Sequence, residues 1–342
     1  MMTELLSPVS SPDVITPYAE KQSIKHWEKN PSPVLKDANA AVQKHFRKNS
    51  HVINIAEGNH FKDGVFLAPE FSGRQVLRIG QRRGEQDWFV RGGSAHNVSF
   101  GIIEIRDSET GEVKLLNVAV KPFKQTAKGI IEIKNTLKVL DRGFKTVHPI
   151  CFISEEDSGF LVSVARTDTK TLDSEPWSQF HTGEFLAKTY FEQLIHRNAV
   201  LLADLHASGI RHSDPQLKNF WVTPRGNVEG IDWEASTVYP IPVSEESFLT
   251  ASMDDLPTYF YSLCGISPRE DEQRSSSVEI LVGTRDKRWQ QFNDLFLRFY
   301  SLRAFERLLD DFAIEGDRLI ELFNDADNES QLQEMLKTNL GI

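Results

Sequence analysis

This sequence of 342 residues has little cysteine, no long apolar run and no excess of positive charge. Its two cysteines, Cys151 and Cys264, lie far apart, which excludes a disulfide scaffold and predicts free thiols in a reducing compartment. No stretch approaches the ~20 apolar residues that span a membrane as a helix. Because 49 acidic residues outnumber 39 basic ones and give a net charge of −10, we expect no nucleic-acid partner.

What the sequence does contain is the composition of an ordinary globular protein, with 39% hydrophobic and 26% charged residues. This length suffices for one large domain or two modest ones with a sizeable core. The first residues lack the basic and apolar regions of a secretory signal, so the expected location is cytoplasmic. Residues 1–50 are predicted to form an N-terminal extension, partly disordered, with polar helices over 19–29 and 35–48.

Residues 51–168 are predicted to be rich in β-structure, because β-branched runs alternate there with turn residues. Short apolar runs broken by Gly and Pro predict irregular strands over 51–82. Apolar positions at helical spacing, followed by Gly143, predict a helix over 126–142. Regular strands are expected at 86–91, 98–107, 113–123, 149–154 and 159–165.

Residues 169–342 are predicted to be mainly helical. The longest helical pattern covers 184–208, and two strands are expected over 220–232, around a Pro-Arg-Gly-Asn turn. Further helical patterns cover 250–264, 286–313 and 316–338.

The residues that point to chemistry follow the longest predicted helix. His212, Asp214 and Asn219 form the pattern H-x-D-x-x-x-x-N, and Asp232 ends an apolar strand thirteen residues after Asn219. Carboxylate and amide oxygens suit Mg²⁺, which keeps waters and substrate phosphates as its other ligands. One aspartate is then left to act as a base. This combination suits phosphoryl transfer, where catalysis is mostly positioning and neutralisation of charge.

The pattern resembles the protein-kinase-like superfamily. The spacing from Asp214 to Asn219 matches the kinase catalytic loop, and the spacing from Asn219 to Asp232 matches the gap to the metal-binding Asp of the DFG segment. The resemblance implies that Asp214 is the catalytic base and that Asn219 and Asp232 hold Mg²⁺. It makes His212 a structural member of the loop.

The same resemblance implies a two-lobed α+β fold, with an antiparallel β-rich N-lobe over 51–168 and a mainly helical C-lobe over 169–342. In the N-lobe, Lys121 would pair with the α- and β-phosphates of ATP, and Glu132 on the next helix would orient it. Small residues in a turn let main-chain N–H groups approach phosphates. The other nucleotide-binding residues implied are Gly92, Gly93, Ser94, Ala95, His96 and Asn97 in such a turn, and Val164 and Arg166 in the hinge.

Three departures separate the chain from ordinary protein kinases. Ser213 replaces the Arg of H-R-D, Gln216 replaces a common Lys, and Glu234 replaces the Gly of DFG. The resemblance is therefore closer to the atypical branch, which includes aminoglycoside-, choline- and lipopolysaccharide-kinase-like families. It further implies that Asp254 or Asp255, in the next helix, braces the catalytic loop.

The function expected from the resemblance is ATP- and Mg²⁺-dependent transfer of a phosphoryl group to a hydroxyl. Three classes of acceptor stay open, namely a small molecule, a sugar or lipopolysaccharide, and a protein, because the sequence carries no readable code for the acceptor. It carries none for the oligomeric state either. One alternative is a weakly active or inactive pseudokinase that binds nucleotide or a partner as a scaffold. Another is an enzyme of the same fold that transfers AMP.

Overall fold

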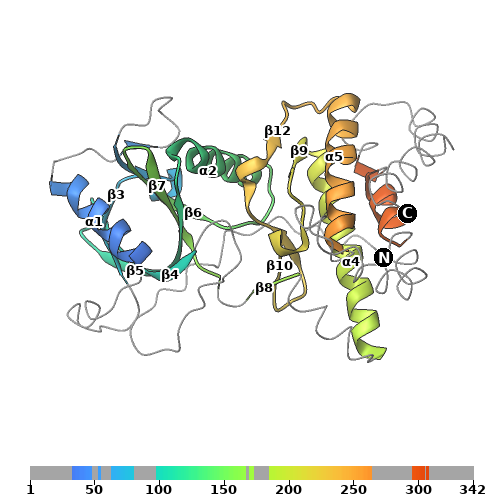
Figure 1. Ribbon diagram of the computed structural model, residues 1–342, viewed down its shortest axis with the longest axis horizontal. Helices are drawn as coiled ribbons and strands as arrows, with labels where there is room; N and C mark the ends of the chain where they lie inside the picture. The colour runs from blue at the N-terminus through green and yellow to red at the C-terminus, as the bar shows by residue number, and fades with distance from the viewer. Residues whose placement is uncertain are drawn as a thin grey trace, which may run out of the picture. The chain divides into compact units, whose positions relative to one another are not determined.

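The computed structural model describes residues 33–47, 53–54, 63–80, 98–166, 169–172, 185–263, 295–304 and 306–307 (Figure 1). The chain divides into two compact units, residues 1–143 with 147–167, and residues 144–146 with 168–342. Both units contain helices and strands, so the prediction of a mixed α and β fold is confirmed. Among the residues described, no helix combines the length and apolar character that crossing a membrane requires.

The first unit is built on a seven-stranded sheet in the order β1-β2-β6-β7-β5-β4-β3. Neighbouring strands are antiparallel, except for the parallel pair β1 and β2. The regular strands predicted after residue 97 are all present, whereas 86–91 lies outside the described residues. The strands are β1 (Ile53–Asn54), β2 (Gly64–Leu67), β3 (Arg74–Gly80), β4 (Ser99–Asp107), β5 (Val113–Phe123), β6 (Pro149–Glu155) and β7 (Ser158–Val164).

This sheet has two apolar faces, and a different helix covers each of them (Figure 1). Successive side chains of a strand point to opposite faces. Val65 and Leu67 therefore belong to the core under α1 (Pro33–Arg47), while Phe66 between them belongs to the core under α2 (Thr126–Asp141). Both helices match the ranges predicted from the sequence to within two residues at each end.

The thiol of Cys151 is free and fully buried in this sheet, as its apolar strand predicts, while Cys264 lies outside the described residues. Burial raises the pKa of the Cys151 thiol, so the reactive thiolate is scarce at neutral pH. In the folded protein at pH 8 we expect Cys151 to react with iodoacetamide at least about tenfold more slowly than a free cysteine. Peptide mass spectrometry with and without denaturant measures this, and rapid labelling of the folded chain would contradict the burial.

The second unit combines short strands with longer helices (Figure 1). The sequence Phe220–Gly230 forms the predicted hairpin, and β8 extends it to three strands. A separate pair joins β9 and β12. The elements are β8 (Lys170–Thr171), α4 (Phe185–Ala207), β9 (Ile210–Arg211), β10 (Phe220–Val222), β11 (Val228–Gly230), β12 (Thr237–Val238) and α5 (Glu245–Leu263), with helical residues also at 295–304 and 306–307.

Helix α5 begins at Glu245, five residues before the predicted start at 250. Ser244 caps it: its Oγ accepts the N–H of Ser247 at 3.1 Å, and its carbonyl accepts the N–H of Phe248 at 3.0 Å. The prediction followed the apolar residues, which start later than the cap. The predicted helices over 19–29 and 316–338 lie outside the described residues.

Aromatic side chains fill the core of the second unit. Tyr259 of α5 stacks on Phe296 with ring centroids 4.6 Å apart, and Phe296 stacks on Tyr300 at 6.1 Å. Phe220 meets Tyr259 edge to face. All four rings are at most 4% exposed. Offset and edge-to-face aromatic pairs contribute beyond the apolar area that they bury, so this cluster holds α5 and the hairpin rigidly together.

Candidate active site

Lys121 and Glu132 form a buried ion pair in the first unit. Alternation along β5 puts Val120 in the core under α1, so the next side chain, Lys121, emerges on the face that α2 covers. Lys121 Nζ donates to Glu132 Oε2 at 2.7 Å, and the two side chains are 14% and 4% exposed. Nζ also lies 5.1 Å from the centroid of the Phe123 ring. A carboxylate this buried requires its counter-charge, so each member of the pair fixes the other.

The other nucleotide-binding residues predicted for the first unit are described only in part. Val164 ends β7, and Arg166 follows two residues later. The Val164 N–H donates to His148 O at 2.8 Å, and the Ala165 N–H donates to Asn117 O at 2.9 Å. A base bound at this segment therefore has to use other main-chain groups. The predicted turn from Gly92 to Asn97 lies outside the described residues.

In the second unit, Asp255 of α5 braces the loop that carries Asp214. Asp255 Oδ2 accepts the main-chain N–H of His212, and Oδ1 accepts that of Ser213, both at 2.7 Å. Ser213 has φ 65°, in the left-handed region that non-glycine residues rarely adopt. Of the two aspartates left open by the sequence, Asp255 is therefore the bracing residue, while Asp254 pairs with Arg211.

The Asp214 carboxylate is held by two amide side chains. Asn219 Nδ2 donates to Asp214 Oδ2 at 2.9 Å and to its carbonyl oxygen at 2.8 Å. Gln216 Nε2 donates to Asp214 Oδ1 at 2.7 Å. These bonds close the H-x-D-x-x-x-x-N segment into a compact loop. They also direct the Asn219 amide nitrogen at Asp214, so the atom of Asn219 that suits a metal ion is its amide oxygen.

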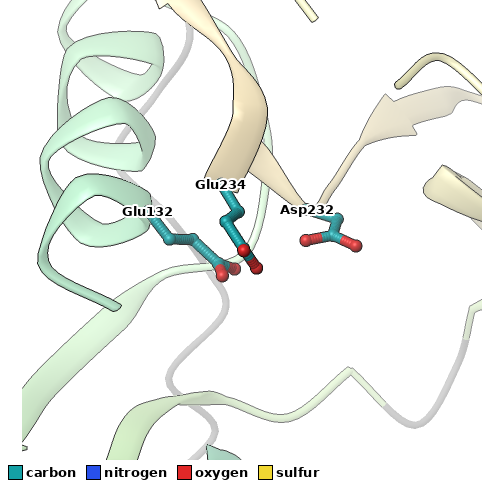
Figure 2. A group of neighbouring side chains, drawn as sticks. All are labelled: Glu132, Asp232 and Glu234. Atoms are coloured by element: carbon teal, nitrogen blue, oxygen red, sulfur yellow. The ribbon is translucent and has the colours of Figure 1, made fainter. Parts of the chain in front are cut away.

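Asp232 lies next to this loop along the hairpin. The Ile231 N–H donates to Asn219 O at 2.9 Å, which continues the pairing of β11 with β10 and brings the main chains at Asn219 and Asp232 close together. Asp232 has φ 66° and ψ 64°, a left-handed conformation. Figure 2 shows the side chains of Asp232 and Glu234 on the segment after β11, and that of Glu132 on α2.

The donor set of the second unit fits a hard divalent cation. Asn219 offers an amide oxygen and Asp232 a carboxylate, and neither sulfur nor imidazole is among the predicted ligands. Two such oxygens are too few for an all-protein Ca²⁺ cage, but they suit Mg²⁺, which is usually held by one or two carboxylates together with phosphates and waters.

Two residues that support these groups were missed in the sequence. Thr146 is buried, and its hydroxyl bonds to Gly230 O and Trp233 Nε1, at 2.7 and 2.8 Å. His206 is fully buried and bonds through Nε2 to Asp255 Oδ2 at 3.0 Å. A single Thr far along the chain from its partners carries no sequence signal. His206 lies six residues before His212 and gives a signal only once the loop is recognised.

The comparisons with known proteins find matches among solved structures alone. No protein-family model matches the sequence, and no curated protein does. Among solved structures, the chain is similar to one described as "WaaP in complex with acyl carrier protein", with 15% sequence identity and a TM-score of 0.39. The match covers 69% of this chain and 85% of that one. At this TM-score the likeness does not establish a shared function, so the functional conclusion depends on the residues themselves.

Proposed function

We propose that the chain is an ATP- and Mg²⁺-dependent phosphotransferase of the kinase-like superfamily that acts on a hydroxyl group. The observation that carries the proposal is the loop of the second unit. Asp214, Asn219 and Asp232 occupy one braced segment of main chain, closed by the Asn219–Asp214 and Ile231–Asn219 hydrogen bonds. The loop thus presents a base and two oxygen ligands on a rigid support, which phosphoryl transfer requires.

In the proposed reaction, Asp214 accepts the proton of the acceptor hydroxyl. The hydroxyl oxygen forms a bond to the γ-phosphorus of ATP, the bond from that phosphorus to the β,γ-bridging oxygen breaks, and ADP leaves with the electron pair. Asn219 and Asp232 hold Mg²⁺, which supplies neutralisation of the phosphate charge when bound. The two amide contacts of Asp214 fix the direction in which its carboxylate meets the acceptor.

The first unit supplies the proposed nucleotide-binding half, in a two-lobed arrangement with the boundary near residue 168. Lys121 is held by Glu132 and is 14% exposed at its side chain, which suits an ammonium that meets the phosphates of ATP. The turn from Gly92 to Asn97 would cover those phosphates, and main-chain groups between Val164 and Arg166 would bind adenine. A cytoplasmic location is part of the proposal, since ATP and Mg²⁺ are plentiful there.

The alternative is a pseudokinase that binds nucleotide without turnover. It is favoured by the replacement of a common kinase Lys with Gln216, an uncharged residue that contacts Asp214 Oδ1. Product analysis separates the two functions and also detects AMP transfer, since the mass added to the acceptor differs.

The first experiment measures the melting temperature of the protein with ATP, with and without Mg²⁺. A ligand at 100 times its Kd stabilises the folded state by about 2.7 kcal/mol, and we expect Mg²⁺·ATP to raise the melting temperature accordingly. Asp232→Asn should remove the part of this shift that needs Mg²⁺, because it removes a ligand of the metal.

The matched control is Asp141→Asn, an exposed aspartate at the end of α2. This variant should respond to Mg²⁺·ATP as the wild type does. A folded wild-type protein with no response to Mg²⁺·ATP would contradict the proposed function. A shift that survives in Asp232→Asn would contradict the role of that residue.

A further inference from the structure

Asp232, the proposed metal ligand, has a main-chain conformation that it does not prefer. Its φ of 66° and ψ of 64° lie in the left-handed region, which non-glycine residues rarely adopt. Such a conformation persists only where the surrounding structure holds it in place. The neighbours of Asp232 must therefore fix it from both sides.

On the N-terminal side, Ile231 is fixed through both of its main-chain polar groups. Its N–H donates to Asn219 O at 2.9 Å, and its carbonyl oxygen bonds to His212 Nε2 at 3.0 Å. His212 is fully buried, and its main-chain N–H donates to Asp255. The residue before Asp232 is thus tied to the catalytic loop.

On the C-terminal side, Trp233 is fixed through its side chain. The indole is 1% exposed, its ring centroid lies 4.6 Å from that of His212, and its Nε1 donates to Thr146 Oγ1 at 2.8 Å. Thr146 in turn donates to Gly230 O at 2.7 Å. A Cβ at Gly230 would lie 2.8 Å from the indole ring, so the hairpin strand has no room for a side chain there. The Thr146 hydroxyl therefore links Gly230 to Trp233, the two residues that flank Ile231 and Asp232.

We propose that Thr146 and Trp233 are positioning residues, and that the chain of hydrogen bonds Trp233 Nε1–Thr146 Oγ1–Gly230 O holds Asp232 in the conformation that binds the metal. This inference rests on the proposed function and deepens it. The hydroxyl must accept one bond and donate another, which serine and threonine can do and valine cannot. Phenylalanine at position 233 would keep an aromatic ring but lose the donor and part of the buried volume of the indole.

The first test measures hydrogen exchange of the Trp233 indole N–H by NMR, assigned by its disappearance in Trp233→Phe. In the wild type this N–H should exchange slowly, because it is buried and bonded. Thr146→Val should speed the exchange, whereas Thr146→Ser, the matched control, should keep it slow. Slow exchange in Thr146→Val would overturn the link, whether or not the protein has enzymatic activity.

The second test measures binding of Mn²⁺, as a probe for Mg²⁺, to the ADP-loaded protein by electron paramagnetic resonance. Loss of a residue that orients a metal ligand typically weakens metal binding 10- to 100-fold. We expect about a tenfold loss in Thr146→Val and in Trp233→Phe, with ADP binding in the absence of metal unchanged and Thr146→Ser like the wild type. A merely structural role would lower the melting temperature but leave Mn²⁺ binding unchanged, and that result would overturn the proposal.

The two tests separate this inference from the proposed function. If the wild type has a protected indole but binds no Mn²⁺ with ADP, the proposed function fails, and the positioning role fails with it. If the wild type binds Mn²⁺ and the Thr146→Val and Trp233→Phe variants bind it equally well, only the positioning role fails. Trp233→Phe keeps the test decisive if Thr146→Val does not fold.

Discussion

Asp214→Asn should lower the rate of phosphoryl transfer by about 10²–10⁴-fold, the range that general base catalysis contributes. The substitution removes the proton acceptor while keeping the size of the side chain. Asp214 lies outside the proposed metal ligands, so the melting-temperature shift with Mg²⁺·ATP should remain. Single-turnover kinetics with an excess of enzyme over labelled ATP measures the chemical step directly.

The hydrogen bonds of Asp214 add a second reason for a large effect. Its two carboxylate oxygens each accept a bond from an amide NH₂ group, of Asn219 and of Gln216. An asparagine at 214 would turn an NH₂ group of its own toward one of these donors. One hydrogen bond is then lost, which lowers the free energy of unfolding by about 1 kcal/mol. The variant should therefore still fold. Retained turnover in a folded Asp214→Asn would contradict its role as the base.

The sequence predicted those parts of the candidate site whose residues lie close together in the chain. Lys121 and Glu132 are 11 residues apart, near the end of β5 and in the second turn of α2, and the kinase resemblance implied their pairing. The sequence predicted separate roles for Asp214 and Asn219, whereas the hydrogen bond between them, across five residues of loop, was not predicted. The sequence did not decide whether Asp254 or Asp255 braces the loop. Both lie in the same helical pattern, and only the rotation of α5 about its axis distinguishes them.

Thr146 shows why the rest could not be predicted. Its partner Gly230 is 84 residues away, and the segment between α2 and β6 has no periodicity that would point to a contact. Long-range packing decides this contact. The start of α5 was misplaced for a local reason, since the capping Ser244 precedes the apolar pattern that marked the helix.

Asp255→Ala should have the largest effect on stability, lowering the free energy of unfolding by about 3–5 kcal/mol, which is typical when one partner of a buried charged network is removed. The Asp255 carboxylate is fully buried, and it accepts the N–H groups of His212 and Ser213 and contacts His206. Removing it leaves buried donors without acceptors. Urea denaturation followed by circular dichroism measures the change.

The neighbouring residue provides the control. Asp254 has a side chain that is 51% exposed and pairs with Arg211 at the surface, so Asp254→Ala should cost at most about 1 kcal/mol. The two substitutions differ by one position on the same helix and remove the same group. Equal losses of stability would contradict the bracing role of Asp255.

The Asp255 network also predicts how stability and activity are coupled. His206 Nδ1 bonds to Tyr300 OH at 2.7 Å, and burial raises the pKa of Tyr300, so its hydroxyl stays neutral and able to donate. The Asp255 carboxylate accepts the N–H of the left-handed Ser213 and so helps to hold that conformation. In any Asp255→Ala protein that still folds, the loop is free to relax at Ser213. Turnover should therefore fall together with stability, whereas Asp254→Ala should retain both.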